Sequence, residues 1–242
     1  MLTNTHHYTD PAGRGDESRP SAQSGSVEAS ANNYPQREKI DQLIRSSLPM
    51  EDIVYAFAYG SGVFSQNLEG DTEEDPTRLV DVIVVVRDVN AFHQANLVLN
   101  PAHYWIPPLV SSSAEATASW CTWLQRYQPP LWLGRNPGLY FLLTDSFKYG
   151  VVQVDDLVDD LKHWRYLYLA GRLHKPVLTL LEHDEGLGIG TLQNSCNLPS
   201  ALASALLMSQ ASSNNASEVK RSGARTSSEI FQRISKLSYL GD

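Results

Sequence analysis

Short apolar runs bounded by glycine, proline or acidic residues recur along the central part of the chain. Five of them have the length and the β-branched or aromatic content of strands: residues 53–59, 79–86, 139–144, 149–154 and 177–181. The run 79–86 has the strongest strand character, and Asp81 is the one charged residue inside it. These runs predict a sheet whose strands are largely buried.

Helical periodicity occupies the intervals between these runs. The clearest predicted helix starts at Asp155 or Asp156 and ends at Gly171, with Pro176 shortly after. Its apolar face consists of Leu157, Leu161, Trp164 and Tyr168, spaced by 4, 3 and 4 residues. Further helices are predicted at about 37–48, 88–99, 113–127 and 198–209, and from about residue 228 onward. The fold class is therefore α/β (α+β), with a mixed sheet and flanking helices.

The patterns divide the chain into three predicted parts. Residues 1–38 have no apolar period and predict a disordered leader, whose serines resemble a transit peptide although its acidic residues do not. Residues 39–182 predict the sheet domain. Residues 183–242 begin at a glycine-rich hinge and predict a truncated helical second domain, with a Ser/Asn-rich linker at 209–228.

Composition excludes several classes of function. The 242 residues carry 27 acidic and 19 basic side chains, a net charge of -8, which argues against a general nucleic-acid binder. Cys121 and Cys196 match no metal or disulfide spacing, so we expect a reducing compartment. No apolar run reaches the ~18–20 residues that span a bilayer, so any membrane contact is expected to be peripheral.

The candidate chemistry lies where the first predicted strand ends. Gly60 and Ser61 form a turn after that strand, and the backbone N–H groups of such a turn can hold phosphate. A carboxylate such as Asp81, inside the next apolar strand, is costly unless it is paired or bound to metal. Together these residues predict a nucleotide triphosphate on the turn and Mg²⁺ on Asp81, the arrangement of nucleotidyltransferases.

A second metal-binding carboxylate is expected two residues after Asp81, but Ile83 occupies that position. Asp88 is too far along the strand and points to its other face. The acids that remain open as the second ligand are Glu74, Asp75 and Asp145.

A family resemblance is carried by several ordered blocks. They are Tyr59-Gly60-Ser61-Gly62-Val63-Phe64, the Asp81 strand, Asn100 with His103-Tyr104, Lys148-Tyr149-Gly150-Val151, residues 168–177 (YLAGRLHKPV) and Leu237-Ser238-Tyr239-Leu240-Gly241-Asp242. Over about residues 38–242 the chain resembles the mitochondrial CDP-diacylglycerol synthases, also called translocator assembly and maintenance proteins. Compared with that family, segment 105–137 is long and the chain is expected to be C-terminally short, with a partial winged-helix-like second domain.

The resemblance implies a phosphatidate cytidylyltransferase. Such an enzyme joins CTP and phosphatidic acid to give CDP-diacylglycerol and pyrophosphate with Mg²⁺, peripherally on the matrix side of the mitochondrial inner membrane, and feeds cardiolipin synthesis. In this sequence Asp81 and Ser61 would be catalytic, and Gly60, Ser61 and Lys148 would bind the CTP phosphates. Asp81 would hold the metal.

The basic cluster Arg172, His174 and Lys175 is expected to bind the phosphatidate headgroup or the leaving pyrophosphate. The alternative for Arg172 is an ion pair with Asp155 or Asp159, and Lys148 is alternatively a solvated surface residue. His93 and His103 could contact nucleotide, although isolated histidines are more often structural. Two other functions stay open: a different nucleotidyl transfer, or a catalytically degenerate binding or assembly subunit.

Overall fold

The computed structural model describes residues 34–60, 63, 79–105, 113–127, 138–183, 188–215 and 227–237. Most of the predicted leader 1–38 lies outside these ranges. The first described element is helix α1 (Tyr34–Ser47), which starts a few residues before the predicted position and ends ahead of Pro49.

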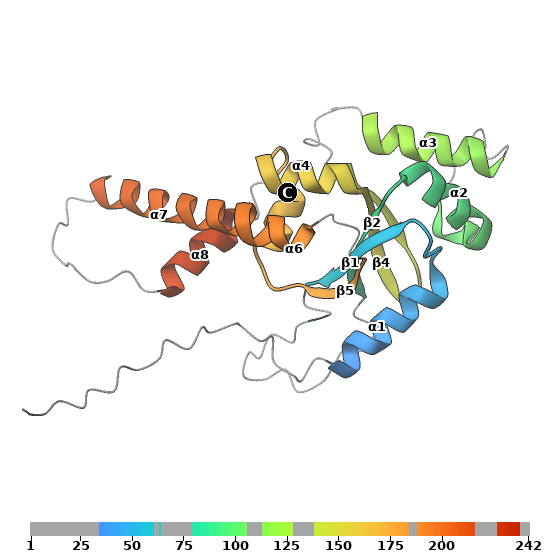
Figure 1. The fold of residues 1–242 in the computed structure, drawn as a ribbon, viewed down its shortest axis with the longest axis horizontal. Coiled ribbons are helices and arrows are strands. Elements are labelled where there is room, and N and C mark those ends of the chain that lie inside the picture. Colours follow the sequence, from blue (N-terminus) through green and yellow to red (C-terminus); the bar gives the residue numbers. More distant parts are fainter. Residues whose placement is uncertain are drawn as a thin grey trace, which may run out of the picture. The chain divides into compact units, whose positions relative to one another are not determined.

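Five strands form one mixed sheet (Figure 1). They are β1 (Ile53–Tyr59), β2 (Val80–Val86), β3 (Tyr140–Leu143), β4 (Phe147–Gln153) and β5 (Leu178–Glu182), in the spatial order β3-β4-β2-β1-β5. The central pair β2–β4 is parallel, and the other three pairs are antiparallel. The predicted α+β class with a mixed sheet is confirmed, and each predicted strand is present within a few residues of its expected bounds.

Helices cover both faces of the sheet, which explains why its central strands are apolar throughout. On one face, α1, α2 (Val89–Leu99) and α3 (Ala114–Tyr127) pack on side chains such as Ala56, Val84 and Tyr149. On the other face, α4 (Val154–His163) and α5 (Tyr168–Leu173) pack on Phe57, Ile83 and their neighbours. The 3₁₀ turn η2 (Pro101–His103) follows α2, whose N-terminus is capped by the Asp88 side chain.

The single helix predicted for 155–171 is wrong, because the chain forms two helices there. Helix α4 ends at His163, and Trp164 and Leu167 adopt left-handed backbone conformations with φ of 51° and 60°. The carboxylate of Asp160 accepts bonds from four backbone N–H groups between residues 166 and 170, and this holds the bend. Gly171 therefore lies inside α5 and does not end the helix.

The C-terminal segment is more helical than predicted. Helix α6 (Ile189–Leu192) leads through a π-helical turn, η3 (Gln193–Asn197), into α7 (Leu198–Asn215), and α8 (Ser227–Leu237) follows. The helix thus begins before residue 198 and includes 209–215, which were predicted as linker; residues 216–226 lie outside the described part. The boundary at 182/183 and the incomplete second domain stay predictions.

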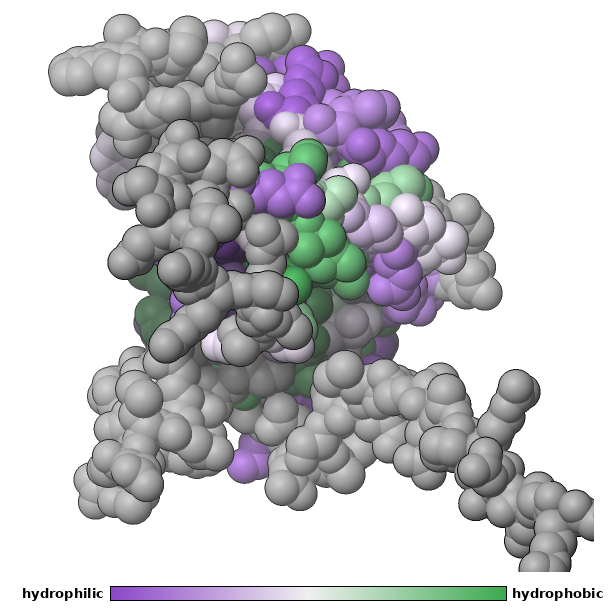
Figure 2. Space-filling model, turned by 90° about the vertical axis from the view of Figure 1, so that its left-hand side faces the viewer, coloured by the Kyte–Doolittle hydropathy of each residue, from purple (hydrophilic) through white to green (hydrophobic). Residues whose placement is uncertain are grey.

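Helices α7 and α8 pack through Ala201, Ala205 and Ile234, and they leave apolar side chains on the surface. Those of α7 are Leu198, Leu202, Leu206, Leu207 and Met208, and Phe231 of α8 is also exposed. Figure 2 faces the side from which α7 and α8 project in Figure 1, and it shows apolar residues near the middle of that side. Of the helices in the described ranges, none is long and apolar enough to cross a membrane.

Candidate active site at one end of the sheet

Strand pairing brings three predicted positions into a row. Asp81 is the register partner of Tyr59 on β1 and of Lys148 on β4. Residues opposite each other on neighbouring strands share a face of the sheet, so all three side chains start on the face covered by α4 and α5. The row lies at the end of the sheet where β1 finishes.

Gly60 begins the turn directly beside the Asp81 carboxylate. Its φ of 85° is in the left-handed region, where glycine is favoured because it has no side chain. A Cβ atom built on Gly60 would lie 3.6 Å from Asp81 Oδ2. The predicted partners Gly60 and Asp81 are therefore adjacent in space, whereas Ser61 lies outside the described residues.

Asp81 is less buried than its sequence context predicts. It is the second residue of β2 and is partly exposed at the sheet end, so the prediction of a carboxylate in the middle of a buried strand is wrong. Burial starts one residue later, at Val82. Within the described ranges, no hydrogen bond or ion pair engages the Asp81 carboxylate. It is available to a cation without the loss of a protein contact.

The second metal ligand is not found in the described part of the chain. Ile83 is fully buried, and Asp88 caps α2. Asp145 is exposed in the β3–β4 turn, and its charge acts on His103, which lies on the opposite face of the sheet. Glu74 and Asp75 lie outside the described residues. No group of three or more His, Cys, Asp or Glu side chains in these ranges is arranged to hold a metal ion.

Arg172, Phe141 and Tyr168 border the row formed by Tyr59, Asp81 and Lys148. The guanidinium carbon of Arg172 lies 4.7 Å from the ring centre of Tyr168 and 5.5 Å from that of Tyr59. Lys148 Nζ lies 4.8 Å from the ring centre of Phe141, which is 6.5 Å from that of Tyr168. A cation that lies against an aromatic ring can also attract a phosphate group, so both side chains are candidates to bind one.

Tyr59 lies at the centre of this arrangement. Burial raises the pKa of its phenol, the charges of Tyr168 and Asp81 raise it further, and Arg172 opposes the shift. The hydroxyl therefore stays protonated near neutral pH. It can act as a hydrogen-bond donor beside Asp81 without adding negative charge to the site.

The structure separates the three residues of the predicted basic cluster. His174 follows Arg172 by two residues, which places it about 200° around the helix axis. Its Nε2 is 2.9 Å from Asn197 Oδ1, and burial lowers the pKa of the ring. The neighbouring charge of Lys175 also lowers the pKa of His174. Of the cluster, Arg172 is the member that reaches the sheet-end row.

Asp159, one of the two acids considered as an ion-pair partner of Arg172, pairs with other residues. Asp159 is bonded instead to His163 at 2.9 Å and to Arg165 at 3.4 Å. Arg172 contacts the two tyrosine rings of the sheet-end row.

His93 and His103 belong to a hydrogen-bond network under α2, on the opposite face of the sheet. His93 is fully buried, with Nδ1 2.9 Å from the Tyr104 hydroxyl and Nε2 3.2 Å from Gln125 Oε1. Burial lowers the pKa of His93 to about 4, so the ring is neutral. His103 Nδ1 lies 2.9 Å from the Tyr149 hydroxyl. These contacts fit the structural interpretation of both histidines.

Comparison with known proteins now places this site in a family. The family model described as mitochondrial phosphatidate cytidylyltransferase matches residues 41–242. The chain belongs to this family. The relevant curated relatives carry the same name: one from Dictyostelium discoideum is 34% identical over 235 residues, covering 87% of this chain and 48% of the relative. One from Caenorhabditis briggsae is 33% identical and covers 81% of this chain and 53% of the relative. One from Drosophila melanogaster is 34% identical and covers 80% of this chain and 53% of the relative. The chain spans about half the length of these relatives.

For this member of the cytidylyltransferase family, sequence reasoning missed the aromatic part of the site. The sequence patterns assign no role in the site to Tyr59, Phe141 or Tyr168. The available signal was alternation, since Tyr59 lies two residues after Phe57 and therefore on the same face as Asp81 of the paired strand. The contact of Arg172 with Tyr59 needed the bend after α4, which the apolar pattern does not show.

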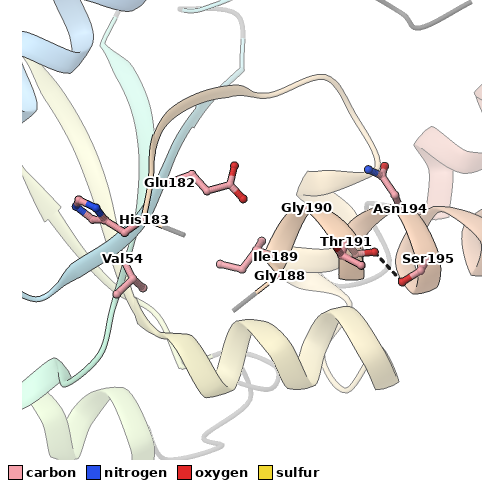
Figure 3. A pocket seen from close by; sticks show the side chains of 9 residues that line it. All are labelled: Val54, Glu182, His183, Gly188, Ile189, Gly190, Thr191, Asn194 and Ser195. Atoms are coloured by element: carbon pink, nitrogen blue, oxygen red, sulfur yellow. Dashed lines mark hydrogen bonds between the residues drawn. The ribbon is translucent and has the colours of Figure 1, made fainter. Parts of the chain in front are cut away.

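A cavity among the described residues lies elsewhere. It has a volume of about 560 Å³ and is lined by Val54, Glu182, His183, Gly188, Ile189, Gly190, Thr191, Asn194 and Ser195. In Figure 3 Glu182 reaches toward α6, while the ring of His183 points away from it. Val54 lies near the start of β1 and Gly60 directly follows its end, six residues later, roughly 20 Å at 3.3 Å per residue. The cavity is therefore separate from the sheet-end row.

Proposed function

We propose that the protein is a phosphatidate cytidylyltransferase, which transfers the cytidylyl group of CTP to phosphatidate and releases pyrophosphate. The observation that carries this proposal is the meeting of Gly60, Asp81, Lys148 and Arg172 at one end of the sheet. A tight turn, a carboxylate and two cations are what a triphosphate with its metal requires. The family membership supports the choice of substrates.

The proposed reaction is an in-line displacement at phosphorus. An oxygen of the phosphatidate phosphate forms a bond to the α-phosphorus of CTP, and the bond from that phosphorus to the bridging oxygen of pyrophosphate breaks. The attacking phosphate is already an anion, so the site needs no strong general base. Its task is to align two anionic groups and to offset the charge that accumulates on their oxygens.

The residues divide this task between them. Gly60 and Ser61 would hold the β- and γ-phosphates through the turn, and Lys148 would neutralise one of them. Arg172 would bind the phosphatidate headgroup or the leaving pyrophosphate. The Tyr59 hydroxyl, kept protonated by burial, would donate a hydrogen bond to a phosphate oxygen.

The donor set fits Mg²⁺ in part. Mg²⁺ is commonly held by one or two carboxylates and by substrate phosphate oxygens. Asp81 supplies one such carboxylate, partly exposed and without a competing protein contact within the described ranges. Bound there together with the nucleotide, the ion would supply charge neutralisation on the phosphates.

We also propose where this chemistry takes place. The substrate phosphatidate is a membrane lipid, so the protein must reach a bilayer surface. The exposed leucines of α7 offer apolar area for peripheral contact. The relatives are named as mitochondrial, which supports a mitochondrial location. The matrix side of the inner membrane and a product that feeds cardiolipin synthesis complete the proposal, on the family resemblance alone.

The test is pyrophosphate release from CTP by the purified chain with Mg²⁺ and phosphatidate vesicles. Release should require phosphatidate, prefer CTP and vanish in Asp81→Asn, while Asp145→Asn in the exposed β3–β4 turn serves as the matched control. Release with soluble phosphomonoesters in place of phosphatidate would indicate a different nucleotidyl transfer. Equal CTP binding by wild type and Asp81→Asn would refute the metal role of Asp81.

A further inference from the structure

Asn197 is a fully buried polar residue outside the sheet-end row, and its carboxamide makes four hydrogen bonds. Oδ1 accepts from Trp164 Nε1 at 2.8 Å and bonds His174 Nε2 at 2.9 Å. Nδ2 donates to the Ala170 carbonyl at 3.0 Å and to Gln193 Oε1 at 2.7 Å. A carboxamide has capacity for two donated and two accepted bonds, so this one is saturated.

The chemistry of the partners fixes the orientation of this side chain. The indole N–H of Trp164 can only donate, so the atom facing it must be Oδ1. The Ala170 carbonyl can only accept, so the atom facing it must be Nδ2. His174 consequently carries its proton on Nε2. The geometry therefore permits one arrangement of Asn197 and one tautomer of His174.

The bonds of Asn197 bracket Arg172 in the sequence. They reach Ala170 on one side and His174 on the other, and both belong to α5 or its C-terminal cap. Gln193, a partner of Asn197, also donates to the Leu173 carbonyl. Gln193 and Asn197 lie four residues apart in the helical turn 193–197, a spacing that puts both on the same side, toward α5.

Helix α5 depends on such support. It has six residues, whereas isolated helices shorter than about 12–15 residues are marginal in water. Asp160 holds its N-terminal side through four backbone N–H groups, and Asn197 holds its C-terminal half. In this orientation of α5 the guanidinium carbon of Arg172 lies 5.5 Å from the ring centre of Tyr59 at the sheet end.

We propose that Asn197 is a positioning residue, which fixes α5 so that Arg172 points into the anion site beside Asp81. Through it, the segment that begins the C-terminal helices sets the affinity of the sheet domain for a phosphate group. The inference rests on the proposed function, in which Arg172 binds phosphatidate or pyrophosphate.

The test is a double-mutant cycle with two probes on the full chain. Pyrophosphate binding is measured by calorimetry, and binding of vesicles that contain phosphatidate is compared with binding of pure phosphatidylcholine vesicles. The variants are Arg172→Ala, Asn197→Leu and their combination. Asn194→Leu is the matched control, since Asn194 lies in the same π-turn with an exposed side chain.

We expect Arg172→Ala to weaken binding of one probe about tenfold or more, which identifies the anion that Arg172 holds. Asn197→Leu should weaken the same probe by roughly three- to tenfold, and Asn194→Leu should bind as wild type does. The combined variant should bind no more weakly than Arg172→Ala alone, because coupled residues are not additive. If Asn197→Leu does not fold, Trp164→Phe removes one of the four bonds and should show a smaller effect of the same kind.

The outcomes distinguish a failure of the proposed anion role of Arg172 from a failure of the positioning role of Asn197. If Arg172→Ala binds both probes as wild type does, the anion role of Arg172 in the proposed function is wrong, and the inference falls with it. Arg172→Ala could weaken binding of a probe while Asn197→Leu weakens it by a further, independent factor in the combined variant. In that case Asn197 acts on folding, and only the inference about Asn197 is overturned. An Asn197→Leu variant that is folded and binds like Asn194→Leu has the same consequence.

Discussion

Replacing Asp160 by asparagine should destabilise the protein far more than the same change at its neighbour Asp159. Asp160 is buried, with an exposed fraction of 1%. Its Oδ1 accepts from the N–H groups of residues 166 and 167 at 2.8 Å, and its Oδ2 accepts from those of 169 and 170 at 2.9 Å. Asparagine keeps one of the two oxygens and turns an NH₂ group toward the remaining pair of donors.

The magnitude follows from the number of bonds lost. A hydrogen bond to a charged group contributes about 1.5–3 kcal/mol, so the loss of two costs about 3–6 kcal/mol. That is a large part of the roughly 5–15 kcal/mol by which proteins are stable. At about 2–4 °C per kcal/mol for a protein of this size, the melting temperature should fall on the order of 10 °C.

The assay is urea unfolding followed by circular dichroism, with the slope of the transition compared between variants. Asp159→Asn is the matched control, because its exposed carboxylate forms only surface ion pairs with His163 and Arg165. The midpoint of Asp159→Asn should stay close to that of wild type. If Asp160→Asn lost no more stability than Asp159→Asn, the four backbone bonds would not be what holds the bend between α4 and α5.

Three further predictions concern the turn, a buried histidine and the apolar surface. Gly60→Ala should lower the stability by about 1–2 kcal/mol and weaken CTP binding, because φ is 85° at this position. The control is Gly190→Ala, whose Cβ would lie an ordinary 3.7 Å from Glu182. Thermal melts and calorimetry should show no change in stability or in CTP binding for this control. The pKa of His93 is about 4 in the fold and 6.5 when exposed, so the unfolded state binds more protons between these values. The free energy of unfolding should therefore be constant above pH 6.5 and fall by about 3 kcal/mol toward pH 4. Urea unfolding at several pH values should show a smaller decrease in His93→Gln. Leu207→Ser should lower co-sedimentation with phosphatidate vesicles, whereas Val98→Ser, equally exposed on α2, should not; equal losses would exclude α7 as the contact surface.

Local patterns were sufficient for the elements whose determinants are local. The strands were predicted from β-branched runs, and α2 was expected at about 88–99, close to its observed bounds Val89–Leu99. The break after α4 was missed because Leu157, Leu161, Trp164 and Tyr168 continue a helical spacing across it. What ends α4 is the set of backbone bonds to Asp160, and the apolar pattern contains no trace of them.

The candidate site shows the same division between local and non-local information. Gly60 and Asp81 could be singled out by residue type, but their contact depends on antiparallel pairing of β1 with β2. Lys148 joins them because β4 pairs in parallel with β2, across more than sixty residues of sequence. Sequence grouped Arg172 with His174 as one basic cluster, whereas helical geometry sends them to opposite sides of α5.

The strand order has a consequence for the moment at which the chain is synthesised. Strand β1 is apolar on both faces, and its outer partner β5 is made last among the strands, after residue 177. Until that segment has left the ribosome, β1 carries an open row of backbone donors and acceptors, which is the feature that recruits other chains. The early part of the sheet therefore needs protection from aggregation until β5 has been synthesised and pairs with β1.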